Sequence, residues 1–294
     1  MLFCYSKWMK KFLSYGKPLL IVVLLLANFF LWPIVWQRQN RLLTVAFLDV
    51  GQGDAIFIEA PNGNQVLIDG GPGRKVLSEL GKVMSFYDRS IDLIIATHPD
   101  SDHIGGLPVV FDSYRIAGFI WPEVVCKNAI CEALESKVDT ESAREIIASR
   151  GEKIVLGDGV ELEILSPAGP VRGNDTNAAS VVAKLTYGQI SFLFTGDAPQ
   201  AIENYLANKD GEKLNVDVLK VGHHGSDTSS SPQFLAATSP AVAVISVGQE
   251  NRYGHPKQSV LDLLNKNGVK IFRTDLEGVL IFRTDGTRII SPKL

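Results

Sequence analysis

Short apolar or alternating runs, separated by turn residues, dominate the chain from residue 42 onward. Runs of this length predict buried or half-buried strands. In the first half of the chain they lie at residues 42–48, 55–59, 65–68 and 91–96. Residues 51–53 and 61–64, which are rich in glycine and asparagine, separate the first three runs, so we expect these strands to be joined by tight turns.

Apolar residues recur at helical spacing in residues 75–86 and 129–150, which predicts a helix over each range. Further helices are predicted at residues 199–208, 232–237 and 258–267. The remaining predicted strands are residues 160–165, 180–186, 190–194, 216–221, 241–247, 270–273, 278–282 and 288–291. Two successive groups of strands with helices between them predict two sheets packed face to face, with helices outside. No linker separates residues 42 to 294, so we expect one domain.

A run without charged residues extends from Pro18 to Trp36. As a helix rising about 1.5 Å per residue, it would nearly cross the ~30 Å hydrocarbon core of a membrane. Four lysines precede it, so the positive-inside rule predicts a cytoplasmic N-terminus. We expect a single-pass protein of the cell membrane, with a basic segment at residues 1–17, an anchor at 18–37 and an extracellular part at 38–294. A cleaved signal peptide is disfavoured, because the run is long and no small-residue cleavage site follows it.

Composition narrows the class of protein. With 46% hydrophobic and 21% charged residues, the chain is an ordinary globular protein rather than a disordered one. Residues 1–37 contain four lysines and no acid, so the rest of the chain, with 25 basic and 32 acidic residues, has a balance of −7. That balance argues against a general nucleic-acid-binding surface, although bound divalent metal would offset it locally. Cys126 and Cys131 form either a disulfide, which persists outside the cytoplasm, or two free thiols.

The densest group of candidate metal ligands follows the strand predicted at residues 91–96. Within six residues it contains His98, Asp100, Asp102 and His103. Imidazole and carboxylate are the ligands that Zn²⁺, Mn²⁺ and Fe²⁺ take from nitrogen and oxygen donors. A solvated acidic turn would explain the aspartates but not two histidines at this spacing.

All five histidines follow predicted strands, in loops that contain glycine or proline. The other three are His223, His224 and His255, and Asp197 also lies at the end of a strand. Histidines placed for packing or solubility would also occur on helices or exposed strands. Their distribution therefore predicts one metal site built from several strand ends.

A series of motifs runs in order from about residue 45 to residue 285. It comprises residues 47–54, 67–71, 97–106, 174–177 with Ser180, 195–197, 221–226, 251–256 and 273–275. The series resembles the metallo-β-lactamase superfamily, whose signature is an H-x-H-x-D-H loop followed by later histidines and an aspartate. More narrowly, it resembles the extracellular hydrolase domain of ComEC-type competence (DNA uptake) membrane proteins. The resemblance implies an α/β (α+β) fold, a four-layer αββα sandwich.

Two departures from the superfamily pattern fall on its first metal site. Asp100 stands where the signature has its second histidine, and the region of Asn177 stands where many members have a later histidine. The resemblance implies a complete second site formed by Asp102, His103, Asp197 and His223. It implies a weaker first site formed by His98, Asp100 and Asp197. The expected cofactors are one or two divalent ions, Zn²⁺ or Mn²⁺, and the carboxylate-rich set also admits Mg²⁺.

Further residues are expected around the ligands and the substrate. Besides the ligand Asp102, the catalytic candidates are His224, Ser226 and His255, each of which has a structural hydrogen bond as its alternative role. Asp69 is expected to orient a ligand histidine through a hydrogen bond, or else to form a turn. The other residues expected to support the ligands or contact the substrate are Asp54, Asn177 and Ser180.

The resemblance implies a membrane-anchored, metal-dependent phosphodiesterase or nuclease that acts on extracellular DNA, single- or double-stranded, during uptake. The expected partners are DNA, membrane lipid through the N-terminal helix, and a separate membrane channel protein. A metallo-hydrolase of another small-molecule ester or phosphodiester is the alternative, and the incomplete first site argues against lactams. A catalytically inactive metal- or DNA-binding module is the alternative of another class. It would bind DNA despite chelation and cleave none.

Overall fold

The computed structural model describes residues 18–25, 29, 42–126, 128–171 and 175–291 of the chain. The chain divides into two compact units after residue 41, and the second unit contains every strand described below. Residues 18–25 are helical. Over the described ranges, the structure has no helix that is both long and apolar enough to span a membrane. Residues 1–17, 26–28 and 30–37, on which the predicted basic segment and most of the predicted anchor fall, lie outside the described residues.

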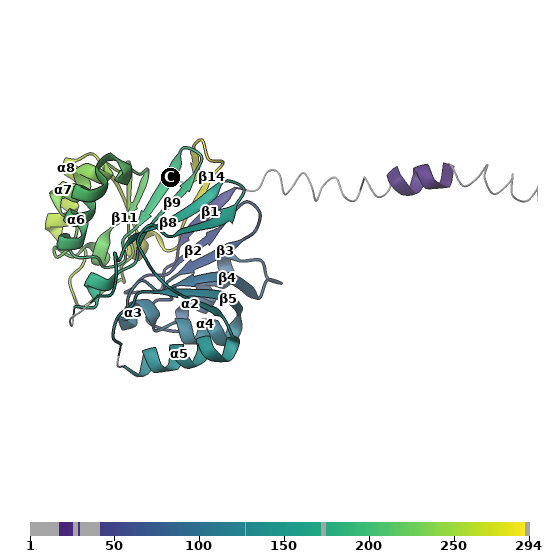
Figure 1. Ribbon diagram of the computed structural model, residues 1–294. Coiled ribbons are helices and arrows are strands. Elements are labelled where there is room, and N and C mark those ends of the chain that lie inside the picture. Colours follow the sequence, from purple (N-terminus) through teal and green to yellow (C-terminus); the bar gives the residue numbers. More distant parts are fainter. Residues whose placement is uncertain (1–17, 26–28, 30–41, 127, 172–174, 292–294) are drawn as a thin grey trace, which may run out of the picture. The chain divides into compact units, whose positions relative to one another are not determined.

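Two sheets form the centre of the second unit (Figure 1). The first has the strand order β15-β14-β1-β2-β3-β4-β5-β6, and the second has the order β13-β12-β11-β10-β9-β8-β7. The first sheet consists of β1 (Leu43–Phe47), β2 (Ile56–Glu59), β3 (Gln65–Ile68), β4 (Ser90–Ile95), β5 (Arg115–Trp121), β6 (Arg144–Ile147), β14 (Leu280–Thr284) and β15 (Ile289–Ser291). The second consists of β7 (Lys153–Gly157), β8 (Val160–Ser166), β9 (Val182–Tyr187), β10 (Ile190–Phe194), β11 (Val218–Lys220), β12 (Val242–Ile245) and β13 (Lys270–Arg273).

Helices cover the outer face of each sheet (Figure 1). The first sheet packs against α2 (Lys75–Val83), α4 (Leu107–Ser113) and α5 (Ala129–Glu141), and the second against α6 (Gln200–Asp210), α7 (Pro232–Thr238) and α8 (Gln258–Lys266). The short elements are α3 (Ser101–Ile104), α9 (Thr274–Glu277) and the 3₁₀ turns η1 (Asn177–Ala179), η2 (Gly211–Leu214) and η3 (Gly222–Gly225).

The two sheets bury their inner faces against each other. Phenylalanines from both sheets meet there, with ring centroids 6.1 Å apart for Phe192 and Phe282 and 6.2 Å apart for Phe47 and Phe194. These rings lie within one apolar cluster that draws side chains from both sheets. Because each sheet is apolar on both faces, its strands carry the near-continuous apolar runs seen in the sequence. The predicted two-sheet sandwich with helices outside is confirmed.

The predicted helix at residues 129–150 is wrong in its second half. α5 ends at Glu141, because Ser142 adopts a left-handed conformation with φ 53° that cannot continue a helix. Residues Arg144–Ile147 instead form β6, which pairs in parallel with β5 at the edge of the first sheet. Two charged residues followed by two isoleucines fit the end of a helix or an edge strand, and only the neighbouring β5 decides between them. Cys126 and Cys131, on either side of the start of α5, form a disulfide.

Candidate metal centre

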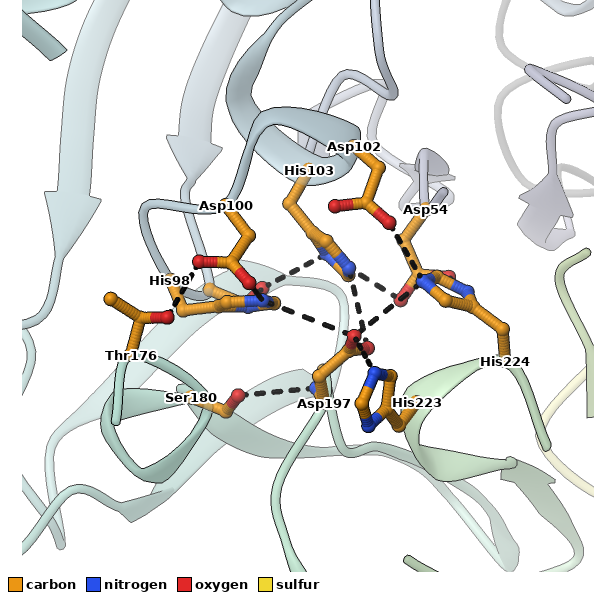
Figure 2. Close-up of polar contacts among 12 residues, drawn as sticks. Asp54, His98, Asp100, Asp102, His103, Thr176, Ser180, Asp197, His223 and His224 are labelled. Carbon is orange, nitrogen blue, oxygen red and sulfur yellow. Dashed lines mark hydrogen bonds and ion pairs between the residues drawn. The ribbon is translucent and has the colours of Figure 1, made fainter. Parts of the chain in front are cut away.

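The candidate ligands lie in loops that leave the carboxyl ends of strands in both sheets. In the first sheet, β1 leads to Asp54, β3 to Asp69, and β4 to the loop with His98 and His103. In the second sheet, β10 leads to Asp197 and β11 to His223 and His224. Figure 2 shows the side chains of His98, His103, His223 and His224 gathered around Asp197. Segments far apart in sequence therefore form one site.

Two of these loops approach so closely that only glycine fits between them. Gly53 has φ +132°, and a Cβ atom on it would lie 2.0 Å from the carbonyl oxygen of Asp102. The next residue, Asp54, donates its backbone N–H to the same oxygen at 3.3 Å. The glycine before Asp54 thus lets the loop after β1 dock against the loop after β4.

The carboxylate of Asp197 is the centre of the site. Its Oδ1 lies 3.2 Å from Nε2 of His103, and its Oδ2 lies 3.5 Å from Nε2 of His224, 3.7 Å from Nε2 of His223 and 4.0 Å from Nε2 of His98 (Figure 2). The backbone N–H of Asp197 donates to Oγ of Ser180 at 3.1 Å, which fixes the turn that carries the carboxylate. Four imidazole nitrogens thus face one buried acid.

The donor atoms at this centre fit a divalent metal ion. Within the described residues, Nε2 of His98, His103 and His224 and Oδ1 of Asp197 are buried and have no hydrogen-bond partner. Buried polar atoms are almost always paired in folded proteins, so four unpaired atoms aimed at one point call for a ligand. Nitrogen and oxygen donors of this kind suit Zn²⁺ and Mn²⁺. Ligand atoms of Asp54, His103, Asp197 and His224 lie within 4.8 Å of one another.

His103 is oriented from behind by Asp69. Oδ2 of Asp69 lies 2.8 Å from Nδ1 of His103, and the same carboxylate accepts hydrogen bonds from the backbone N–H and the hydroxyl of Thr97. This is the hydrogen bond expected of Asp69, whose φ of 59° also places it at a turn. Burial by itself lowers the pKa of His103, but the charges of Asp197 and Asp69 hold that pKa well above its usual value.

His98 and Asp100 form a second, more open group of donors. Nε2 of His98 lies 3.8 Å from Oδ2 of Asp100, and Asp100 also accepts a hydrogen bond from the hydroxyl of Thr176 at 2.6 Å. The Asp100 side chain is 39% exposed, whereas that of His98 is fully buried. Burial, with the neighbouring charge of His103, lowers the pKa of His98 to about 3, so its imidazole is neutral and free to act as a ligand.

His223 and His224 are adjacent but face the site differently. Both adopt left-handed backbone conformations, with φ of 48° and 54°, which are uncommon and strained for residues other than glycine. His224 is buried, and its Nδ1 donates to the carbonyl oxygen of Ser246 at 2.9 Å, which leaves Nε2 pointing at Asp197 and, at 3.4 Å, at Asp102. His223 is 27% exposed and contacts the Thr228 hydroxyl through Nδ1.

The electrostatic environments of these two histidines also differ. Burial lowers the pKa of His224, but the charge of Asp197 and the contacts with Asp102 and Asp54 raise it to about 9. Burial instead lowers the pKa of His223 below its usual value, since Asp197 offsets only part of that effect. A metal ion at the centre would therefore take the place of the proton on His224.

Asp54 lies behind the histidine ligands rather than in front of them. Its carboxylate oxygens lie 3.5 Å from Nδ1 of His224 and 3.8 Å from Nδ1 of His103, whereas the Nε2 atoms of both rings face Asp197. It also forms a buried ion pair with Lys220. Asp54 therefore lies on the Nδ1 side of both imidazole rings, and its role as a residue that supports the ligands stays a prediction.

Lys220 is the main site residue that the sequence did not assign. Its ammonium is fully buried, donates to the carbonyl oxygen of Gly196 at 2.9 Å and lies 3.7 Å from Oδ1 of Asp197. A lysine inside the run Val218-Leu219-Lys220-Val221, which is otherwise apolar, was the available signal, because lysine is almost never buried without a partner. Nothing in the sequence, however, identified Asp54 as that partner.

The other predicted residues lie around this centre. Asn177 is in η1, and its Oδ1 is buried without a hydrogen-bond partner among the described residues. Ser226 contacts the hydroxyl of Thr228, which in turn contacts His223. The ring of His255 lies 5.7 Å from that of His223. The structure thus places Ser226 and His255 beside His223, at the edge of the site.

Comparison with known families and proteins gives several matches. The family model of the metallo-beta-lactamase superfamily matches residues 48–249. The chain is 32% identical over 260 residues to ComE operon protein 3 of Bacillus subtilis. The matched region covers 81% of this chain and 33% of that protein. It is 34% identical over 263 residues to competence protein ComA of Neisseria gonorrhoeae, and this match covers 88% of this chain and 35% of that protein. The chain therefore spans about a third of the length of these curated relatives.

Solved structures show the same fold at low sequence identity. CmlA, a diiron beta-hydroxylase from Streptomyces venezuelae, superposes with a TM-score of 0.55 at 16% identity, covering 83% of this chain and 55% of CmlA. Tm1679, described as a metal-dependent hydrolase of the beta-lactamase superfamily, superposes with a TM-score of 0.51 at 14% identity, covering 79% of this chain and 95% of Tm1679. At these identities the likeness concerns the fold alone.

Proposed function

The chain belongs to the metallo-β-lactamase superfamily of hydrolases, and we propose that it is a metal-dependent phosphodiesterase that cuts DNA outside the cytoplasmic membrane. The observation that carries the proposal is the set of unpaired histidine Nε2 atoms around the buried carboxylate of Asp197. The name of one relative, competence protein ComA, supports DNA as the substrate.

The proposed ligands form two groups that share Asp197. Asp102, His103 and His224 would hold the firmer ion, because two of these residues are buried and oriented by hydrogen bonds through Nδ1. His98 and the half-exposed Asp100 would hold a weaker second ion. When bound, a divalent ion activates water and stabilises the negative charge that develops on a phosphoryl group.

The geometry favours exchanging the roles that the sequence suggested for His223 and His224. His224 is the buried residue with an unpaired Nε2, as a ligand requires. His223 is partly exposed and linked through Thr228 to Ser226. We therefore assign ligation to His224, and place His223 with Ser226 and His255 on the side that the substrate reaches. There His223, with its lowered pKa, is neutral at pH 7 and able to accept or donate a hydrogen bond to the substrate.

Support for a site outside the cytoplasm comes from two features. The uncharged run from Pro18 to Trp36, preceded by four lysines, has the length and charge asymmetry of a single-pass anchor with a cytoplasmic N-terminus. The disulfide between Cys126 and Cys131 is of a kind that persists in oxidising compartments. We propose that the hydrolase domain faces outward, anchored in lipid, and that DNA it processes passes to a separate membrane channel protein.

The proposal is tested with the full chain and labelled single- and double-stranded DNA, in the presence of Mn²⁺, Mg²⁺, Zn²⁺ or EDTA. We expect cleavage with at least one metal, none in EDTA, and none by Asp102→Ala or His103→Ala. Asp112→Ala, which removes an exposed aspartate in α4, is the matched control and should cleave normally. Cleavage that survives both ligand substitutions would exclude this metal centre. DNA binding without cleavage under any metal would instead identify a binding module.

A further inference from the structure

The loop between β12 and α8 borders the candidate metal centre on its open side. The ring of His255 in this loop lies 5.7 Å from that of His223, whose Nε2 lies 3.7 Å from Asp197. The next aromatic residue outward is Tyr253, whose ring stacks on His255 with centroids 5.9 Å apart and planes inclined by 30°. A row of three rings therefore leads from the buried carboxylate to the surface.

The outer end of this row combines an exposed ring with a guanidinium group. Tyr253 is 48% exposed. The guanidinium carbon of Arg252 lies 5.1 Å from the centroid of the Tyr253 ring, and Nη2 of Arg252 donates to the tyrosine hydroxyl at 2.9 Å. An exposed aromatic ring costs free energy in water, and an adjacent guanidinium provides a planar cation. Together they present an apolar surface and a positive charge side by side.

Hydrogen bonds hold this loop in place. The Asn251 side chain donates to the carbonyl oxygens of Gly248 and His255 and accepts the backbone N–H of His255. The Lys257 side chain donates to the carbonyl oxygen of Tyr253, and the backbone N–H of Lys257 donates to the carbonyl oxygen of Gly225. Gly225 has φ +81°, and a Cβ on it would lie 2.6 Å from Cβ of Pro256. The loop is thus docked against the turn that carries His223 and His224.

Arg252 also interacts electrostatically with the metal centre. Its pKa is raised, mainly by the hydrogen bond to the Tyr253 hydroxyl and also by the negative charge of Asp102. Asp102 is one of the proposed ligands, so a substrate that reaches the centre passes within the field of Arg252. A guanidinium beside an exposed aromatic ring can pair with a phosphate of a strand that stacks on that ring.

We propose that Tyr253 is a stacking platform for an unpaired nucleobase beside the scissile phosphate, with Arg252 binding an adjacent phosphate. The inference rests on the proposed function and deepens it, because it assigns the substrate to single-stranded nucleic acid. Aromatic rings next to cationic side chains are how proteins hold single strands without sequence preference, since every base has a flat face. Bases in a duplex are already stacked and cannot reach the ring.

Binding is measured by fluorescence anisotropy of labelled oligothymidylate on the full chain in EDTA, where the strand is not cut. The matched probe is an abasic strand of the same length, with tetrahydrofuran in place of each base. We expect wild type to bind the base-bearing strand roughly tenfold to hundredfold more tightly. Tyr253→Ala should remove that preference and Tyr253→Trp should keep it. The control is Tyr87→Ala. Tyr87 is 90% exposed and precedes the amino end of β4, whereas the metal centre follows its carboxyl end, so this variant should leave the preference unchanged.

The outcomes separate this inference from the proposed function. If wild type shows no preference for the base-bearing strand, including the case in which it binds neither strand, the stacking site is overturned. A preference that survives Tyr253→Ala overturns it as well. Cleavage of DNA in the metal assay would then leave the nuclease proposal standing. Conversely, a Tyr253-dependent preference with no cleavage under any metal would retain the stacking site and reject the nuclease.

Discussion

Lys220 and Asp54 form an ion pair in the interior of the protein, with 0% of the lysine side chain and 2% of the aspartate side chain exposed. Burial lowers the pKa of Lys220, but the charges of Asp54 and Asp197 raise it above its usual value. Burial raises the pKa of Asp54, and the charge of Lys220 with the contact from His224 outweighs that effect and lowers it. The ammonium of Lys220 therefore offsets part of the negative charge of the buried Asp54 and Asp197 carboxylates.

Removing only one member of this pair should be costly. Lys220→Met leaves Asp54 buried without its cation, and we expect a loss of about 3–5 kcal/mol in the free energy of unfolding, measured by urea denaturation. The double variant Lys220→Met, Asp54→Asn should recover part of that loss, because it leaves no unpaired charge. Strictly additive costs of the two single substitutions would contradict a coupled pair.

Substitution of the two adjacent histidines distinguishes ligand from substrate contact. We expect His224→Ala to weaken Mn²⁺ or Zn²⁺ binding by more than about 100-fold, since losing a ligand exceeds the effect of losing its hydrogen-bond partner. His223→Ala should retain metal affinity and lose activity. Isothermal titration calorimetry measures the affinities. The opposite result would restore the assignment made from the sequence.

Asp69 should affect metal binding through His103. Asp69→Asn keeps the shape but weakens the hydrogen bond to Nδ1, so we expect metal affinity to fall by about 10–100-fold. Asp92→Asn is a suitable control, because Asp92 also accepts a backbone N–H bond but lies on β4 before the strand reaches the site. Equal metal affinities in the two variants would exclude an orienting role for Asp69.

Glu203 in α6 should make stability depend on pH. Burial raises its pKa from 4.5 to about 7, although the backbone N–H groups of Ser230 and Ser231 partly offset the effect. The folded state then binds a proton more tightly than the unfolded state. Its contribution to stability is fully present below pH 4.5 and is lost as the pH rises through about 7.

The difference between the pKa values of Glu203 in the unfolded and folded states corresponds to about 3 kcal/mol in the free energy of unfolding. Urea denaturation at pH 5 and pH 8 measures the change, and Glu203→Gln supplies the reference because glutamine does not titrate. Wild type should lose more stability than the variant between these pH values. If both lose the same amount, Glu203 titrates normally in the folded state.

The sequence alone determined the class of fold and the chemistry of the site. Apolar runs of strand length imply burial on both faces, and this requires two sheets covered by helices. His98, His103, His224 and Asp197 all follow such runs, so their convergence at strand ends could be expected before any coordinates. These features are local in the chain, because side-chain chemistry and periodicity do not depend on distant residues.

Only the tertiary structure decided which atoms face one another. The choice between His223 and His224 depends on two left-handed backbone conformations, which the flanking Gly222 and Gly225 do not by themselves predict. The partner of Lys220 comes from the other sheet, and residues 144–147 become a strand because β5 offers an edge with which to pair. Ion pairs, strand pairing and ligand geometry are contacts between distant segments, and local sequence preferences do not encode which segments will meet.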